Sequence, residues 1–292
     1  MLKGDDKRRE EYIAPKLRCV ERAPERSMPR PADLPDYAAP PLNELVLGVQ
    51  FAPISNYSTV EAGAIWQLFS SEFPNVQEQP ILSPQFETFG GGASPGVQIQ
   101  FGPMAGPMRL WFVTQQGDHL LQFQPDRLLL NWRQNGEGAY PRYERIAETF
   151  RECLCKLDNY VQTTRSYGLD INQIEITYIN VIPVEHVSEH SKWLEIMPAF
   201  GFPIEAMSAN FTEVARSEDG KPIARLHHDL RSVISIDGRN KAFQLNLTYR
   251  GKPTLPGIDG ALELLGKGRV AIVKRFTELA TKAAHDVWKR TI

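Results

Sequence analysis

Apolar and polar residues alternate along much of this chain, in runs that have the length of β-strands. Short links with turn residues, such as Asp219-Gly220, separate successive runs, so we expect antiparallel hairpins. The pattern predicts strands at 44–51, 97–101, 109–114, 119–124, 127–133, 174–184, 205–216, 222–236 and 241–250, with a shorter one at 81–86.

Apolar residues spaced three and four apart predict two long helices, at 142–163 and at 269–290. Shorter helices are expected after Ser58 and near 191–197. The order of elements is therefore a strand, a helix, three to five strands and a helix, and this order occurs twice. It predicts the α+β class, with a mostly antiparallel sheet and the long helices on one face. TATA-binding-like (TBP-like) and helix-grip-like folds have this arrangement.

One strand segment resembles a second segment later in the chain. The stretches LVLGVQFAPI and EITYINVIPV each end one residue after a proline, Pro53 and Pro183. When the stretches are aligned on these prolines, Gln50 falls on Asn180. We interpret the two stretches as matching strands of two pseudo-repeats.

The composition along the chain gives the expected domain limits. Residues 1–40 are rich in charged residues and proline, which predicts a tail that is disordered or loosely docked. Residues 41–168 form the first α+β half, and residues 169–292 form the second. We expect the two halves to pack as one compact unit.

Three stretches carry a resemblance to a known family. The stretches PPLNELVLGVQF (40–51), NWR (131–133) and YPRYE (140–144) resemble those of a sporadically distributed bacterial family of uncharacterised proteins of similar length. The resemblance covers about residues 40–290 and implies a single compact unit. No activity, cofactor or catalytic set is assigned to this family, so the resemblance implies no functional residue.

Charge and cysteine content narrow the possible partners and compartment. The chain has 33 basic and 35 acidic residues, a net charge of −2, which gives no bulk support for a nucleic-acid or membrane partner. Its three cysteines have no framework spacing, which is typical of reduced thiols in the cytoplasm. The apolar runs are also too short to span a membrane.

Period two places amide side chains and arginines on the face of the sheet that points away from the helices. We interpret this face as the binding surface of a non-catalytic recognition or accessory protein with a macromolecular partner. The partner is expected to be another protein, and a homo-oligomer is also compatible with the pattern. The candidate residues are Gln98, Gln100, Gln122, Gln124, Asn131, Arg133, Gln244, Asn246, Thr248 and Arg250. Exchanging Gln122 and Asn246 for Glu is expected to weaken a complex and to leave thermal stability nearly unchanged.

Two alternatives stay open at this point. A nucleic-acid-binding protein would add basic side chains to the same face, and its binding would depend steeply on salt. The basic residues in question are Arg109, Arg127, Arg133, Arg225, Arg231, Arg239 and Lys241. A hydrolase or nuclease would use His227, His228 and Asp229, and these groups would have to meet in one pocket.

No motif for a metal ion or a cofactor is convincing. His186 and His190 are four residues apart but have no evident third ligand. Cys153 and Cys155 would point to different sides of a helix. The glycines at 90–92 lack the lysine and serine or threonine of a phosphate-binding loop. We therefore expect neither a cofactor nor a metal site.

Overall fold

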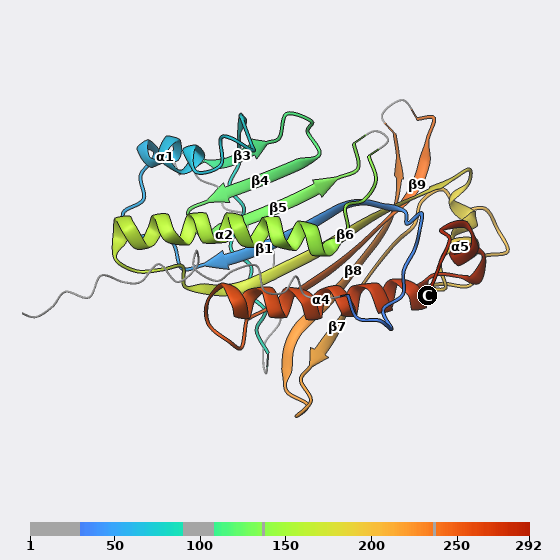
Figure 1. The fold of residues 1–292 in the computed structure, drawn as a ribbon. Coiled ribbons are helices and arrows are strands. Elements are labelled where there is room, and N and C mark those ends of the chain that lie inside the picture. The colour runs from blue at the N-terminus through green and yellow to red at the C-terminus, as the bar shows by residue number, and fades with distance from the viewer. Residues whose placement is uncertain (1–29, 90–107, 136–137, 236–237) are drawn as a thin grey trace, which may run out of the picture.

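The computed structural model describes residues 30–89, 108–135, 138–235 and 238–292. Within them, nine strands form one antiparallel sheet in the order β2-β3-β4-β5-β1-β6-β9-β8-β7 (Figure 1). The strands are β1 (Leu42–Phe51), β2 (Asn75–Gln79), β3 (Arg109–Val113), β4 (His119–Gln124), β5 (Arg127–Arg133), β6 (Ile171–Val184), β7 (Ser208–Arg216), β8 (Pro222–Ile234) and β9 (Lys241–Gly251). The predicted α+β class and the mostly antiparallel sheet are confirmed.

The helices of the described residues are two long ones and several short ones. They are η1 (Thr59–Glu61), α1 (Ala62–Gln67), α2 (Tyr143–Arg165), η2 (Val187–Glu189), α3 (His190–Trp193), α4 (Gly257–Leu279) and α5 (Lys282–Val287). Figure 1 shows α2 and α4 side by side across the same face of the sheet. Most of the core lies between these two helices and the sheet.

The centre of the sheet is the pair β1 and β6. Leu45 lies opposite Tyr178 and Val49 lies opposite Ile174 in this antiparallel pair, and all four side chains are buried. From the centre, each side of the sheet follows the same route. β1 leads to the outer strand β2, and β3, β4 and β5 return to β1; β6 leads to the outer strand β7, and β8 and β9 return to β6.

The α2 helix follows the sequence prediction closely. It begins at Tyr143, directly after Arg142, and it ends before Ser166, which has a φ of +63°. Ile146 and Phe150 are on its buried face. The spacing of apolar residues is therefore enough to place this helix.

The prediction of a helix at 269–290 is wrong at its start and in its middle. The α4 helix begins at Gly257, and a break at Ala280 separates it from α5. Gly268 reads as a helix breaker in the sequence, but it lies inside α4. A Cβ atom at Gly268 would come within 2.7 Å of side-chain atoms of Ile176 and Tyr249. The glycine therefore allows α4 to approach the sheet closely.

We expect the substitution Gly268→Ala to lower the free energy of unfolding by about 1–3 kcal/mol, because overpacking outweighs the gain in helix propensity. The matched control is Gly63→Ala in α1, where nothing lies within 4 Å of the added Cβ. The control should be neutral or stabilising by up to about 1 kcal/mol. Urea denaturation of both variants measures this difference. Equal stabilisation by both substitutions would contradict the close packing of α4.

Residues 30–40, which the sequence assigns to the tail, are packed on the helices. Leu34 and Tyr37 are buried at 0 % and 5 % exposure. The Tyr37 hydroxyl lies 3.0 Å from Thr277 Oγ1 of α4, and the Ala38 N–H donates to Lys289 O at 3.0 Å. This part of the chain therefore belongs to the folded body.

Among the described residues, no helix is both long enough and apolar enough to cross a membrane.

Candidate functional site

The predicted polar positions that the structure describes lie on the face of the sheet opposite the long helices. Asn131 lies opposite Val46 of β1, and Thr248 lies opposite Thr177 of β6, while their sequence neighbours Leu130 and Leu247 point into the core. The same alternation places the remaining candidates on this face, which we call the open face. These candidates are Gln122, Gln124, Arg133, Gln244, Asn246 and Arg250. Gln98 and Gln100 lie outside the described residues.

The proline-based matching of Gln50 with Asn180 is wrong. Gln50 lies on the open face, where its Oε1 accepts hydrogen bonds from the Gln85 N–H and from Arg127 Nη2. Asn180 lies on the helix side, where its Nδ2 donates to Leu245 O at 3.2 Å. The two prolines also differ in position, because one follows the end of β1 and the other lies within β6. An alignment of β1 with β6 in which matched side chains lie on the same face of the sheet must therefore be shifted by one residue.

The main new feature of the open face is a segment of the chain that lies on it. Residues 80–89, which we call the strap, connect the edge strand β2 to the opposite half of the sheet. The Leu82 N–H donates to Gln124 Oε1 at 2.9 Å, and Gln124 Nε2 donates back to Leu82 O at 2.9 Å. The Gln85 N–H donates to Gln50 Oε1 at 3.0 Å. Amide side chains of the sheet thus hold the backbone of the strap.

The strap is not the strand that the sequence predicts at 81–86. Pro80 and Pro84 lack backbone N–H groups and favour an extended chain before them, so the segment cannot complete a regular ladder. Its free backbone groups instead meet side chains, including Arg127 Nη2, which donates to Ser83 O at 3.0 Å. The prediction of a strand at 81–86 is therefore wrong, because this segment contacts side chains on the face of the sheet and does not pair at an edge.

The far end of the strap is held by a charged cluster around Glu87. The Glu87 side chain is only 7 % exposed, and it lies 2.5 Å from Arg225 Nη1 and 2.7 Å from His227 Nε2. Arg250 Nη1 lies 3.5 Å from Glu87 Oε1, the oxygen that His227 also contacts. Burial raises the pKa of Glu87, but hydrogen bonds from His227 and Arg225 and the charges of His227 and Arg250 outweigh it and hold the pKa at about 2.

A pocket of about 260 Å³ lies between the strap and the centre of the sheet. Its floor is Gly48, and its walls include Arg127, Arg250 and the amides of Gln50 and Gln173. Gln173 is 4 % exposed, and its Oε1 has no hydrogen-bond partner within the described part of the chain. Because a buried acceptor without a partner is costly, this pocket suits a group that donates a hydrogen bond.

Three of the predicted amides are buried in hydrogen-bond networks of the protein itself. Gln122 is 6 % exposed, and its Oε1 accepts from Arg109 Nη1 at 2.8 Å and from Trp111 Nε1 at 3.0 Å. Its Nε2 donates to Asn131 Oδ1 at 2.7 Å, while Gln124 is engaged by the strap. Gln122 is therefore a structural residue, and its exchange is expected to change stability, contrary to the expectation from the sequence.

The amides of the second half have a different environment. Gln244, Asn246 and Thr248 are half-buried on β9. Gln244 Nε2 donates to Asn246 Oδ1 at 3.0 Å, and Thr248 Oγ1 lies 2.9 Å from Thr177 Oγ1. These side chains therefore keep part of their surface accessible on the open face.

The structure does not bring the predicted catalytic group together. His227 lies on the open face beside Glu87, whereas His228 is buried on the helix side, 2.7 Å from Glu213 and stacked on Phe211. Burial lowers the pKa of His228. Asp229 lies on the open face, opposite Asn246 of the neighbouring strand β9. Among the described residues, no three His, Cys, Asp or Glu side chains are grouped to hold a metal ion.

Four arginines of the open face pair with carboxylates, whereas Arg109 and Arg231 have no carboxylate partner among the described residues. Arg127 Nε lies 3.4 Å from Asp126, and Arg133 Nε lies 3.1 Å from Glu44. Arg225 and Arg250 share Glu87. A phosphate backbone would have to displace these carboxylates, so the geometry gives the nucleic-acid alternative little support.

The sequence interpretation misses Gln50, Glu87 and Gln173 as residues of this site. The alternation along β1 and β6 is enough to predict that Gln50 and Gln173 lie on the open face. The two residues lie opposite each other in the β1–β6 pair. Glu87 has no such signal, because it lies in an irregular segment.

No protein-family model and no curated protein matches this chain.

Proposed function

We propose that this protein is a non-catalytic recognition protein, and that its open face binds an extended peptide segment of a protein partner. The observation that carries the proposal is the two-way pairing of Gln124 with the backbone of Leu82. A primary amide offers one acceptor and two donors, so it can pair with a peptide group as a neighbouring strand would. The strap is then a built-in example of the ligand that this face accepts.

The accessible amides of β9 support a second binding track beside the strap. The strap contacts Gln124, Gln50 and Arg250, which lie toward one end of the sheet. Gln244 and Asn246 lie toward the other end and keep half-buried amide groups. A partner segment lying across the strands there would use the same kind of amide-to-backbone bond.

We also infer that the chain consists of two structurally related halves, as in TBP-like and helix-grip-like folds. In support, each half leads from a central strand to an outer strand, back to the centre, and then into a long helix across the same face. Membership of the bacterial family suggested by residues 40–51, a cytoplasmic location and association with a second copy remain part of this proposal. The pocket beneath the strap lies next to the junction of the halves and would receive one side chain of the partner.

Binding of a peptide supplied in trans tests the proposed function. The probe is a labelled peptide with the sequence PILSPQFETF of residues 80–89, and the binder is the full chain with Glu87→Gln, which loosens the strap. We expect this variant to bind the peptide at least tenfold more tightly than the wild type, about 1.4 kcal/mol. Adding Gln50→Leu should remove the gain, because the amide that holds Gln85 is lost.

The matched control is Gln67→Leu, which changes an exposed glutamine of α1. It should leave the peptide affinity unchanged. Equal binding by the wild type and the loosened variant, or equal loss through Gln67→Leu and Gln50→Leu, would contradict the proposal. Binding of an oligonucleotide with steep salt dependence, without binding of the peptide, would favour the nucleic-acid alternative.

A further inference from the structure

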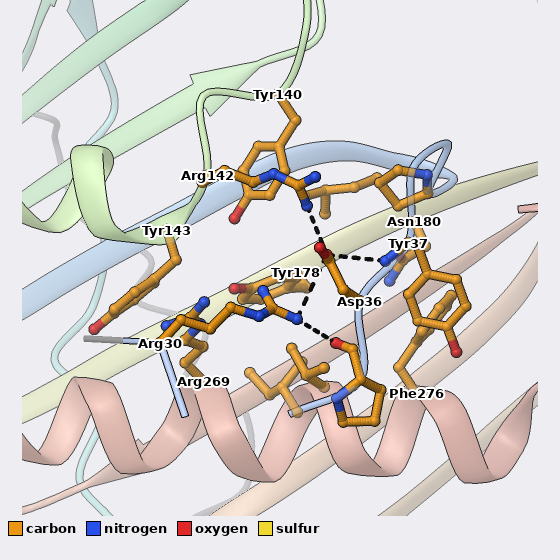
Figure 2. A pocket seen from close by; sticks show the side chains of 15 residues that line it. Arg30, Asp36, Tyr37, Tyr140, Arg142, Tyr143, Tyr178, Asn180, Arg269 and Phe276 are labelled. Atoms are coloured by element: carbon orange, nitrogen blue, oxygen red, sulfur yellow. Dashed lines mark hydrogen bonds and ion pairs between the residues drawn. The ribbon is translucent and has the colours of Figure 1, made fainter. Parts of the chain in front are cut away.

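A second cavity lies on the helix side of the sheet, and we call it the α4 cavity. It is enclosed by residues 30–40, the start of α2, β6 and α4 (Figure 2). Its volume is about 60 Å³. Since a site for one water needs roughly 10–15 Å³ by this measure, the cavity has room for about four to six non-hydrogen atoms.

Three arginines from three separate segments reach this cavity, as Figure 2 shows. Arg30 and Arg142 lie at its mouth, 3.4 Å and 2.7 Å from Asp36. Arg269 reaches it from α4 and lies 2.7 Å from Glu144. Three cations therefore face two carboxylates, which leaves an excess of one positive charge at the cavity.

Arg269 is the most unusual of these residues, because it is charged and only 4 % exposed. Its guanidinium lies 4.7 Å from the centre of the Tyr143 ring. Its Nε has no hydrogen-bond partner in the part of the chain that the structure describes. A buried donor that is left unpaired costs about 1–3 kcal/mol, so the site is incomplete without an acceptor.

The fold places Arg269 at this depth through its neighbour in the sequence. Gly268 lets α4 pack directly on Ile176 and Tyr249, so the next side chain starts close to the sheet. Arg142, at the mouth of the cavity, is held in a rare conformation with a φ of +74°. Backbone strain of this kind is found preferentially at binding sites.

The remaining polar groups of the cavity stay neutral. Tyr140 and Tyr178 both line the cavity. Burial raises the pKa of both tyrosines, so both are protonated at neutral pH and can donate. They therefore add donors to the site without adding negative charge.

The wall formed by α4 and the start of β1 is apolar. It consists of Leu42, Ile272, Val273 and Phe276. An anion with oxygen atoms on every side, such as phosphate, would place some of them against this wall without hydrogen bonds. A carboxylate with a short alkyl chain satisfies both sides of the cavity.

We propose that the α4 cavity binds a short-chain monocarboxylate, with its carboxylate toward Arg269 and its alkyl end against α4. The guanidinium suits this ligand, because its planar donors match a carboxylate and it stays charged when buried. Binding here does not depend on the open face, which lies on the other side of the sheet.

Calorimetric titration of the full chain with propionate and butyrate tests this site. Propionamide and phosphate are the comparison probes, since one lacks the charge and the other lacks the alkyl chain. We expect both carboxylates to bind at least tenfold more tightly than either comparison probe. No binding of propionate at millimolar concentration, or tighter binding of phosphate, would overturn the proposal.

Two variants locate the binding. Val273→Phe fills the cavity without changing its charges, and it should weaken propionate binding at least tenfold. The double variant Arg269→Gln with Glu144→Gln removes both partners of this ion pair, so no carboxylate is left unpaired, and it should weaken binding to a similar extent. The matched control is Ala283→Phe, an exposed position of α5, which should have no effect. Unchanged affinity in the folded Val273→Phe variant would overturn the proposal even if the double variant does not fold.

Discussion

Replacing Glu87 with Gln is expected to lower the free energy of unfolding at pH 7 by about 2–4 kcal/mol. Arg225 and Arg250 lie directly opposite each other on β8 and β9, and Glu87 is the carboxylate between them. Like charges in such a cross-strand pair destabilise a sheet. Without Glu87 this end of the strap loses its anchor, and urea denaturation of the variant and the wild type measures the loss.

The same group makes the stability depend on pH. The pKa of Glu87 falls from about 4.5 to about 2 on folding, which corresponds to roughly 3–4 kcal/mol because one pKa unit is about 1.4 kcal/mol. A depressed pKa stabilises the fold fully above the unfolded pKa, and this contribution is lost as the pH falls from about 4.5 toward 2. The difference between the wild type and Glu87→Gln should therefore be largest at pH 7 and should shrink below pH 4.5.

The control for this prediction is Glu72→Gln. Glu72 pairs with Lys156 at 2.6 Å, but its side chain is 44 % exposed. An exposed pair contributes about 0–1 kcal/mol, so the control should change stability little and show no comparable pH dependence. A pH-independent difference between the wild type and Glu87→Gln would contradict the charged cluster as the anchor of the strap.

Replacing Gln122 with Met is expected to lower the free energy of unfolding by about 2–3 kcal/mol. Methionine has a similar shape but can neither accept from Arg109 and Trp111 nor donate to Asn131. The loss leaves Asn131 Oδ1 without this donor at a position that is 4 % exposed. Thermal and urea denaturation of the variant measure the cost.

The comparison for this prediction is Gln244→Met on the same face. Gln244 is half-buried and donates one hydrogen bond, to Asn246, so its exchange should change stability by no more than about 0.5–1 kcal/mol. Under the proposed function, Gln244→Met should instead weaken partner binding. Similar stability losses in both variants would mean that the two halves of the open face do not differ as described.

Much of the fold could be predicted from the period of apolar residues. Runs such as 119–124 and 127–133 show alternating or continuous apolar patterning, and the structure has strands with these limits. The α4 helix was harder to predict, because Gly260 and Gly268 read as breaks in the sequence. Both glycines lie where the helix touches other backbone or side chains closely, and only the tertiary structure reveals such contacts.

The candidate site could be predicted in part. The period of two places Gln124 and Asn246 on the same face, because alternation fixes the direction of a side chain. It cannot tell whether a polar side chain meets water, a partner or another segment of the protein. The strap covers Gln124 because residues 80–89 cross the face of the sheet. The periodicity of the sequence gives no indication of such a crossing. The alignment on Pro53 failed for a related reason, since a shift of one residue exchanges the faces.

Hydrogen exchange at the backbone amides of Leu82 and Gln85 tests most directly whether the amides of the sheet hold an extended backbone. The amide-to-backbone bonds predict slow exchange of both groups in the wild type. They also predict fast exchange of Leu82 in Gln124→Met and of Gln85 in Gln50→Met. Equally fast exchange of both groups in the wild type and the variants would contradict recognition of a peptide backbone by the open face.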